Sequence, residues 1–129
     1  MEKSELTHRI IGCAYTVYNK LGFGFLESVY SRAMLIELER NGLSVESEKP
    51  LQVYYDGQVV GDFVLDLLVE GELIVELKSV QHLIKNHEVQ LVNYLHGLRK
   101  DVGLLINFGP TGVEIKRKYR TALPTDREA

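Results

Sequence analysis

The sequence has no tryptophan and a single cysteine, Cys13, among its 129 residues. One cysteine cannot form an internal disulfide, so a disulfide-stabilised scaffold is excluded and a reducing compartment fits. No apolar run approaches the roughly 20 residues that span a bilayer. Met1–Thr7 is polar and partly acidic, without the apolar stretch of a secretory signal. We therefore expect a cytoplasmic protein that does not associate with membranes.

The sequence also lacks an excess of either charge. Fifteen basic and eighteen acidic residues give a net charge of −3, so the totals show no basic footprint of a nucleic-acid binder. A local basic cluster, Lys116–Arg120, could contact phosphate or could be a solvated strand edge. Repeats and linkers are missing as well, which predicts one domain over residues 1–129 with a frayed tail at 124–129.

The spacing of apolar residues changes along the chain. Helical spacing predicts one helix capped by Ser4 and a second with Leu26 and Ile36 on its buried side. Segments of alternating or continuous apolar character predict strands, and Asp56-Gly57 predicts a hairpin turn. The predicted helices cover about 4–21, 26–40 and 87–98, and the strands about 51–55, 59–69, 73–78, 102–108 and 113–119. This order, α-α-β-β-β-α-β-β, predicts an α/β fold with a mixed sheet flanked by helices.

Charged residues inside apolar strands are the most informative feature. Asp66 interrupts one strand, and Glu76 and Lys78 interrupt the next. Side chains of a strand alternate between its faces, so Glu76 and Lys78 point to the same side. Burying such charges is costly unless they are paired or hold a cation.

The loop between these two strands decides whether the three charges meet. A two-residue turn at Glu70-Gly71 would place Asp66 opposite Val75, and Glu76 would face away. A three-residue loop over residues 70–72 would instead place Asp66 opposite Glu76. Glycine is common at the centre of such a loop, and we predict this odd-length connection or an equivalent bulge. Asp66, Glu76 and Lys78 would then share one face.

Residues 62–76 contain five acids and no base. Converging carboxylates repel one another unless a proton or cation lies between them, and oxygen ligands without His or Cys favour Mg²⁺ or Mn²⁺. Lys78 could orient water there or stabilise the negative charge of a phosphate. A simple salt bridge among Asp66, Glu76 and Lys78 explains the same residues and stays open at this point.

Two predicted helices add further candidates. Glu27 and Tyr30 lie three residues apart on one helix, where Glu27 could serve only to stabilise the helix start. His87, Gln90 and Tyr94 form a polar stripe on another, which by itself could be a solvated face.

Gly24-Phe25-Leu26-Glu27-Ser28-Val29-Tyr30 matches the GxxExxY signature of a family of small bacterial and archaeal proteins. Residues 61–69, 74–78, 87–95 and 103–109 resemble the same family, and the similarity runs from about Glu5 to about Lys118. That family is placed in the PD-(D/E)xK nuclease-like superfamily. The restriction-endonuclease-like fold of this superfamily, a mixed sheet flanked by helices, agrees with the predicted order.

The resemblance implies roles for individual residues. Asp66 takes the place of the first acid of the motif, with Leu65 in place of the preceding proline, and Glu76 and Lys78 form the ExK pair. Glu27 resembles the helix-borne acid that many members add to the site. Two further residues resemble a QxxxY motif thought to approach the metal or the nucleic acid, namely Gln90 and Tyr94.

The function implied is hydrolysis of phosphodiester bonds in nucleic acid, with DNA a better candidate than RNA. Asp66 and Glu76 would hold Mg²⁺ or Mn²⁺, helped by Glu27 and the carbonyl of Leu77, and Lys78 would act on water or the phosphate. Specificity would come from a homodimer or a partner protein. Two alternatives stay open: a non-catalytic module that binds nucleic acid or protein, and a metal-dependent phosphoesterase for small molecules.

Overall fold

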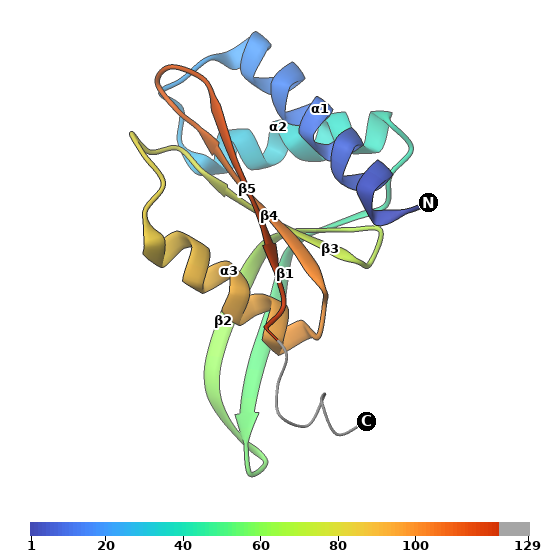
Figure 1. Cartoon of the computed structure of the whole chain (residues 1–129), viewed down its shortest axis with the longest axis vertical. Coiled ribbons are helices and arrows are strands. Elements are labelled where there is room, and N and C mark those ends of the chain that lie inside the picture. Colours follow the sequence, from blue (N-terminus) through green and yellow to red (C-terminus); the bar gives the residue numbers. More distant parts are fainter. Residues whose placement is uncertain (122–129) are drawn as a thin grey trace.

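The computed structural model describes residues 1–121, in which a twisted five-stranded sheet lies between helices on its two sides (Figure 1). The helices are α1 (Lys3–Leu21), α2 (Glu27–Arg40) and α3 (Lys85–Leu98). The strands are β1 (Val45–Tyr55), β2 (Gln58–Val69), β3 (Leu73–Lys78), β4 (Val102–Phe108) and β5 (Val113–Tyr119). This order confirms the predicted α/β fold.

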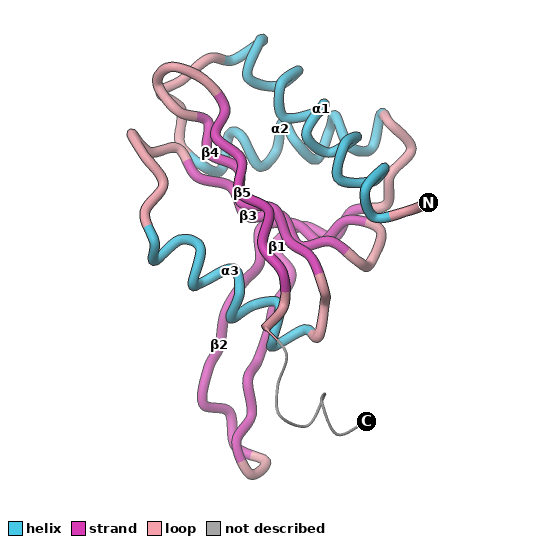
Figure 2. The backbone as a smooth tube through the Cα atoms, in the orientation of Figure 1, coloured by secondary structure: helices cyan, strands magenta, loops and turns pink. Residues whose placement is uncertain are grey.

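The strands are arranged in the sheet as they follow in the chain, β1-β2-β3-β4-β5. β3 and β4 are parallel and joined by α3, while every other neighbouring pair is antiparallel. A parallel pair needs such a crossover, which is why one helix interrupts the run of strands. β1 and β2 form a long hairpin that extends beyond α3 (Figure 2).

Each face of the sheet has its own core. On the face of α1 and α2, the core includes Leu73, Val75 and Leu77 of β3, whereas Ile74 belongs to the core beneath α3. Because side chains alternate along β3, the even-numbered Glu76 and Lys78 are directed to the side of α3. The candidate site therefore lies on the α3 face of the sheet.

Some local predictions were wrong. α1 begins at Lys3, with Glu2 at the N-cap position and no side-chain cap, so Ser4 does not cap it. Leu26 and Ile36 are 76% and 52% exposed. The prediction that Tyr30 and Leu38 belong to the buried side of α2 is confirmed; with Met34 they form a stripe, spaced four residues apart, that faces the sheet.

Two predictions concern features beyond these elements. The frayed tail predicted for residues 124–129 lies outside the described residues. Among the helices of residues 1–121, none combines the length and apolar character needed to cross a membrane.

Candidate active site

The connection between β2 and β3 sets the register of the site. Val69 pairs with Leu73, which leaves the three-residue loop that we predicted. Glu70 and Gly71 both have positive φ values, +55° and +65°, and the loop is fixed to Ser44. The Ser44 N–H donates to Glu70 Oε2 at 2.7 Å, and the Glu70 N–H donates to the Ser44 carbonyl at 2.7 Å. A positive φ is unfavourable for a residue other than glycine, and the two hydrogen bonds with Ser44 stabilise Glu70 in this conformation.

Asp66 and Glu76 meet where the ladder between β2 and β3 ends, one residue beyond the pair Leu67–Val75. Glu76 Oε2 accepts the N–H of Asp66 at 2.8 Å, and Asp66 Oδ2 accepts the N–H of Leu77 at 2.8 Å. Each carboxylate therefore takes a backbone donor of the opposite strand. This exchange holds both acids side by side at the point where the strands separate.

The acid pair is poorly solvated. Glu76 is only 7% exposed, and Asp66 is half-buried. Burial raises the pKa of Glu76 to about 9, and the negative charge of Asp66 contributes to the rise. A hard divalent cation would relieve this repulsion, so the oxygen donors fit Mg²⁺ or Mn²⁺. Within residues 1–121, no cluster of three or more His, Cys, Asp or Glu could hold a metal, so additional ligands from Glu27 or the Leu77 carbonyl remain predictions.

Lys78 is the last residue of β3 and is half-buried. The positive charge of Lys78 lies near enough to oppose the pKa rise of Glu76, but the side chain forms no ion pair or hydrogen bond within the described part of the chain. The simple salt bridge to Glu76 or Asp66 is therefore not what the structure shows. The ammonium group remains available for a phosphate or a water molecule.

Asn107 holds the segment that follows Lys78. This fully buried residue of β4 pairs with Lys78 in the parallel ladder. Asn107 Oδ1 accepts the Val80 N–H at 2.9 Å, and Nδ2 donates to the Val80 carbonyl at 2.9 Å and to Glu114 Oε1 at 2.8 Å. Our sequence analysis assigned Asn107 no role, although an amide within an apolar strand was a signal that could have found it.

Glu27 is the first residue of α2, and its side chain is exposed. A hydrogen bond of 2.7 Å from Ser79 Oγ to the Phe25 carbonyl joins the loop before α2 to the end of β3. Within residues 1–121, no hydrogen bond links Glu27 to Asp66 or Glu76. The start of α2 therefore lies at the end of the sheet where β3 ends, and a direct role for Glu27 in the site stays a prediction.

Tyr30 of the same helix has a structural role. It is fully buried, and its ring stacks on Phe108 with a centroid distance of 4.3 Å. The hydroxyl donates to the Gly22 carbonyl and accepts the Phe25 N–H at 3.5 Å. Tyr30 therefore shapes the glycine-flanked loop that precedes Glu27.

Tyr94 of α3 is directed toward the acids and is not part of a solvated face. It is buried, and its ring packs against Phe63 with a centroid distance of 5.6 Å. Burial raises the pKa of Tyr94, and the charges of Glu76 and Asp66 raise it further. Tyr94 therefore remains a neutral hydrogen-bond donor beside the acid pair. Gln90, one turn earlier on α3, is exposed.

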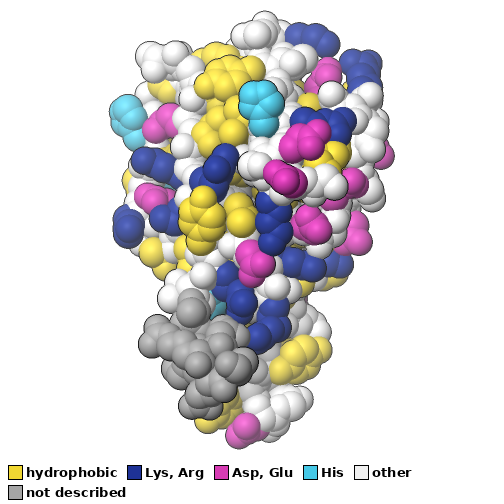
Figure 3. All heavy atoms as spheres, turned by 45° about the vertical axis from the view of Figure 1, so that its right-hand side comes forward, with side chains coloured by type: hydrophobic (Ala, Val, Ile, Leu, Met, Phe, Trp, Pro, Cys, Tyr) yellow, Lys and Arg dark blue, Asp and Glu magenta, His cyan; other side chains and the backbone are white. Residues whose placement is uncertain are grey.

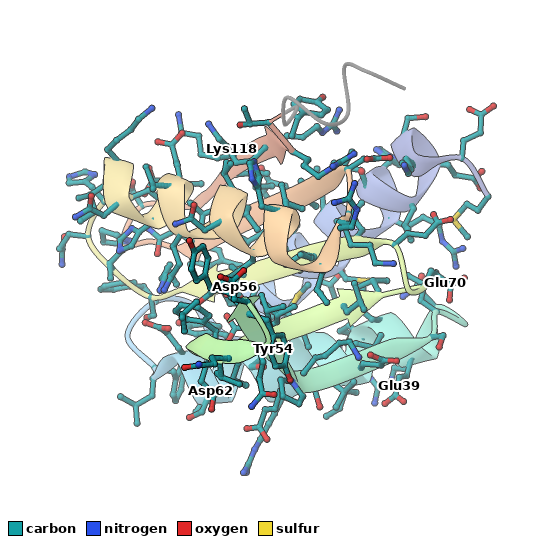
Figure 4. The ribbon with its side chains drawn as sticks, turned by 90° about the horizontal axis from the view of Figure 1, so that it is seen from below. Glu39, Tyr54, Asp56, Asp62, Glu70 and Lys118 are labelled. Carbon is teal, nitrogen blue, oxygen red and sulfur yellow. The ribbon has the colours of Figure 1, made fainter. Side chains whose placement is uncertain are left out.

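The basic cluster, Lys116–Arg120, lies on edge strand β5 and the residue that follows it. Lys118 pairs with Glu88 of α3 at 3.0 Å, and Arg120 pairs with Asp101 at 3.6 Å. Figure 4 shows Lys118 across α3 from the hairpin residues Tyr54 and Asp62. Basic and acidic side chains are intermixed on the face shown in Figure 3. The cluster thus anchors β5 to its neighbours as well as presenting charge.

The sequence model of the PD-(D/E)XK nuclease superfamily matches residues 4–118. The chain belongs to this superfamily. The assignment of Asp66, Glu76 and Lys78 to the motif in the superfamily's name, with Leu65 in place of proline, stays a prediction from the sequence. The match supports the superfamily that our resemblance implied, whereas membership of the narrower GxxExxY family stays a prediction.

A second comparison concerns the fold. The crystal structure of SSO0001 superposes with a TM-score of 0.61 at 16% sequence identity, covering 76% of this chain and 52% of that chain. The present chain thus spans about half of the length of SSO0001, and the likeness supports the shared fold alone. A comparison with curated proteins gave no significant match.

Proposed function

We propose that this protein is a nuclease that uses Mg²⁺ or Mn²⁺ to hydrolyse phosphodiester bonds, with DNA as the first substrate to test and RNA as the second. The observation that carries the proposal is the reciprocal hydrogen bonding of Asp66 and Glu76, with Lys78 on the same side of β3 and, within residues 1–121, in no ion pair with a carboxylate. Membership of the nuclease superfamily supports a nucleic-acid substrate.

In this proposal Asp66 and Glu76 hold the metal, and Glu27 and the Leu77 carbonyl complete its ligands. When bound, the ion lowers the pKa of a water molecule and shields the phosphate. The buried acid pair offers it a site of low local dielectric, where charge interactions are stronger than in bulk water.

The other residues of the site position the phosphate and stabilise the charge that develops on it. Lys78 places its positive charge against the phosphate as negative charge develops in the transition state. Tyr94 donates a hydrogen bond from its neutral hydroxyl, and Gln90 orients Lys78 or the backbone phosphate from the exposed side of α3. Asn107 holds the chain beyond Lys78, so that the lysine keeps its place.

Substrate selection requires more than this site. The described residues contain one small domain without an added recognition module. Sequence specificity would therefore come from a second copy of the chain or from a partner protein.

The direct test is a cleavage panel of single- and double-stranded DNA and RNA with Mg²⁺, Mn²⁺ or EDTA. We expect metal-dependent cleavage that falls by about 10²- to 10³-fold in Lys78→Ala, the range for loss of one transition-state donor. Lys20→Ala is the matched control, because Lys20 pairs with Glu37 on the far side of the sheet.

The same panel distinguishes the alternatives. Hydrolysis of nucleotides or other small phosphates without polymer cleavage would support the phosphoesterase. Nucleic-acid binding without any hydrolysis would support the non-catalytic module. Cleavage that is unchanged in Lys78→Ala would remove Lys78 from the mechanism.

A further inference from the structure

A cavity of about 400 Å³ lies between the β1–β2 hairpin and α3. This volume is in the range of small-molecule sites. The residues that carry the argument come from both walls: Val60, Gly61 and Phe63 from the hairpin, and Asn93, His96 and Gly97 from α3. None of them has a role in the proposed hydrolysis.

Glycines on both walls make room for neighbouring side chains. A Cβ atom on Gly61 would lie 2.7 Å from the ring of Phe63, and one on Gly97 would lie 2.9 Å from the side chain of Leu51. Both distances are too short for a normal contact. The absence of side chains at these positions therefore allows Phe63 and α3 to take their places around the cavity.

The lining combines an aromatic ring with polar groups. Phe63 is 40% exposed although its ring also packs against Tyr94. Asn93 offers an amide with both donors and an acceptor. His96 Nε2 is buried and has no hydrogen-bond partner within residues 1–121.

These features fit a nucleobase. Every base has an apolar face that stacks on an aromatic side chain and a polar edge that exchanges hydrogen bonds. A base in a duplex hides its face in the stack and must be unpaired or extruded to enter a pocket. The cavity thus suits a base from a single-stranded or locally opened segment.

The cavity also adjoins the acid pair. Phe63 precedes Asp66 by three residues on β2, which is about 10 Å along an extended strand. Tyr94 lies between them, since its ring contacts Phe63 and its hydroxyl senses the charges of Asp66 and Glu76. A nucleotide whose phosphate is near Lys78 could therefore reach the cavity with its own base or a neighbouring one.

We propose that the cavity between the β1–β2 hairpin and α3 binds one unstacked nucleobase, which directs the nuclease to single-stranded or locally unpaired nucleic acid. The inference rests on the proposed function for the place of the phosphate, while the base pocket itself is a separate property. Binding and cleavage can therefore be tested independently.

The test measures binding of short fluorescein-labelled single strands of DNA and RNA by anisotropy, with Ca²⁺ as the metal. Each strand is compared with an abasic strand of the same length and charge. We expect about tenfold weaker binding of the abasic strand, in the range found for loss of one base stack. Phe63→Leu should weaken binding of the normal strand by about the same factor and leave the abasic strand unchanged.

Two further variants guard against indirect effects. Val60→Trp fills the cavity from an exposed position without altering Phe63 or Tyr94, and it should weaken binding of the normal strand as Phe63→Leu does. Tyr55→Leu removes an aromatic ring that is 70% exposed on the same hairpin but does not line the cavity, and it should change neither strand. Thermal melting confirms that each variant is folded.

The outcomes separate the two proposals. Equal affinity for normal and abasic strands, no binding of either strand, or no effect of Phe63→Leu and Val60→Trp would overturn the base pocket, whatever the cleavage panel shows. If the normal strand binds more tightly than the abasic strand and Phe63→Leu removes this difference, the base pocket is supported. That holds even if no substrate is cleaved and the nuclease proposal fails.

Discussion

Asp66 and Glu76 each accept a hydrogen bond from the backbone of the other's strand. Glu76 Oε2 takes the N–H of Asp66, and Asp66 Oδ2 takes the N–H of Leu77, both at 2.8 Å. These bonds replace the ladder contacts that end at the pair Leu67–Val75. Two acids in the interior of a sheet are thereby kept adjacent, an arrangement that a proton or a cation must stabilise.

The raised pKa of Glu76 predicts how stability depends on pH without metal. Its folded-state pKa is about 9 against an ordinary value of 4.5, so the folded protein holds a proton that the unfolded chain releases. The free energy of unfolding should therefore fall as pH rises from about 5 to about 9. We expect Glu76→Gln to flatten this slope, measured by urea unfolding in EDTA. Glu72→Gln, at an exposed acid of the neighbouring loop, should keep the slope, and a slope retained in Glu76→Gln would contradict the assignment.

Glu27→Gln tests whether the acid at the start of α2 acts in the site. As a first-turn acid, Glu27 would stabilise the helix by only about 0.3–1 kcal/mol. We expect at least a tenfold loss of cleavage, with a melting temperature lowered by only a few degrees. Thermal melting and initial cleavage rates measure both. A large fall in melting temperature with full activity would instead assign Glu27 to the helix start alone.

Asn107→Ala should be among the most damaging substitutions outside the acid pair. It removes three hydrogen bonds and leaves both backbone groups of Val80 without their side-chain partner. We expect a loss of about 2–4 kcal/mol in the free energy of unfolding, measured with urea. Ser79→Ala, which loses one exposed bond to Phe25, should cost about 1 kcal/mol. Equal stability of Asn107→Ala and wild type would show that this contact does not hold the segment after Lys78.

The sequence predicted the parts of the site that depend on local geometry. The length of the loop over residues 70–72 determined that Asp66 would face Glu76, because side chains alternate with a fixed period and loop length sets the register. The order of helices and strands likewise followed from periodicity alone. Both features are decided by residues close together in the chain.

Features that depend on packing between distant segments were not predictable in the same way. The spacing alone left it open whether the polar stripe of α3 is solvated, whereas Tyr94 is buried because α3 packs over the sheet beside Phe63 of the hairpin. Leu26 and Ile36 were also expected on the buried side of α2, but the stripe that faces the sheet is narrower and excludes both residues. The cavity beside Phe63 likewise exists only because Phe63 of β2 and His96 of α3, 33 positions apart in the chain, line the same space.

Metal binding by the acid pair is the most direct test of the account, and it requires no knowledge of the substrate. Isothermal titration calorimetry with Mn²⁺ on wild type and Glu76→Gln measures it. The glutamine keeps an oxygen that can accept the Asp66 N–H while removing the charge. We predict saturable binding in wild type that is lost in Glu76→Gln, and a matching rise in wild-type melting temperature. No binding in wild type up to about 10 mM Mn²⁺, above the weak end of the affinity scale, or equal binding in both proteins, would contradict the proposal that Asp66 and Glu76 form a metal centre.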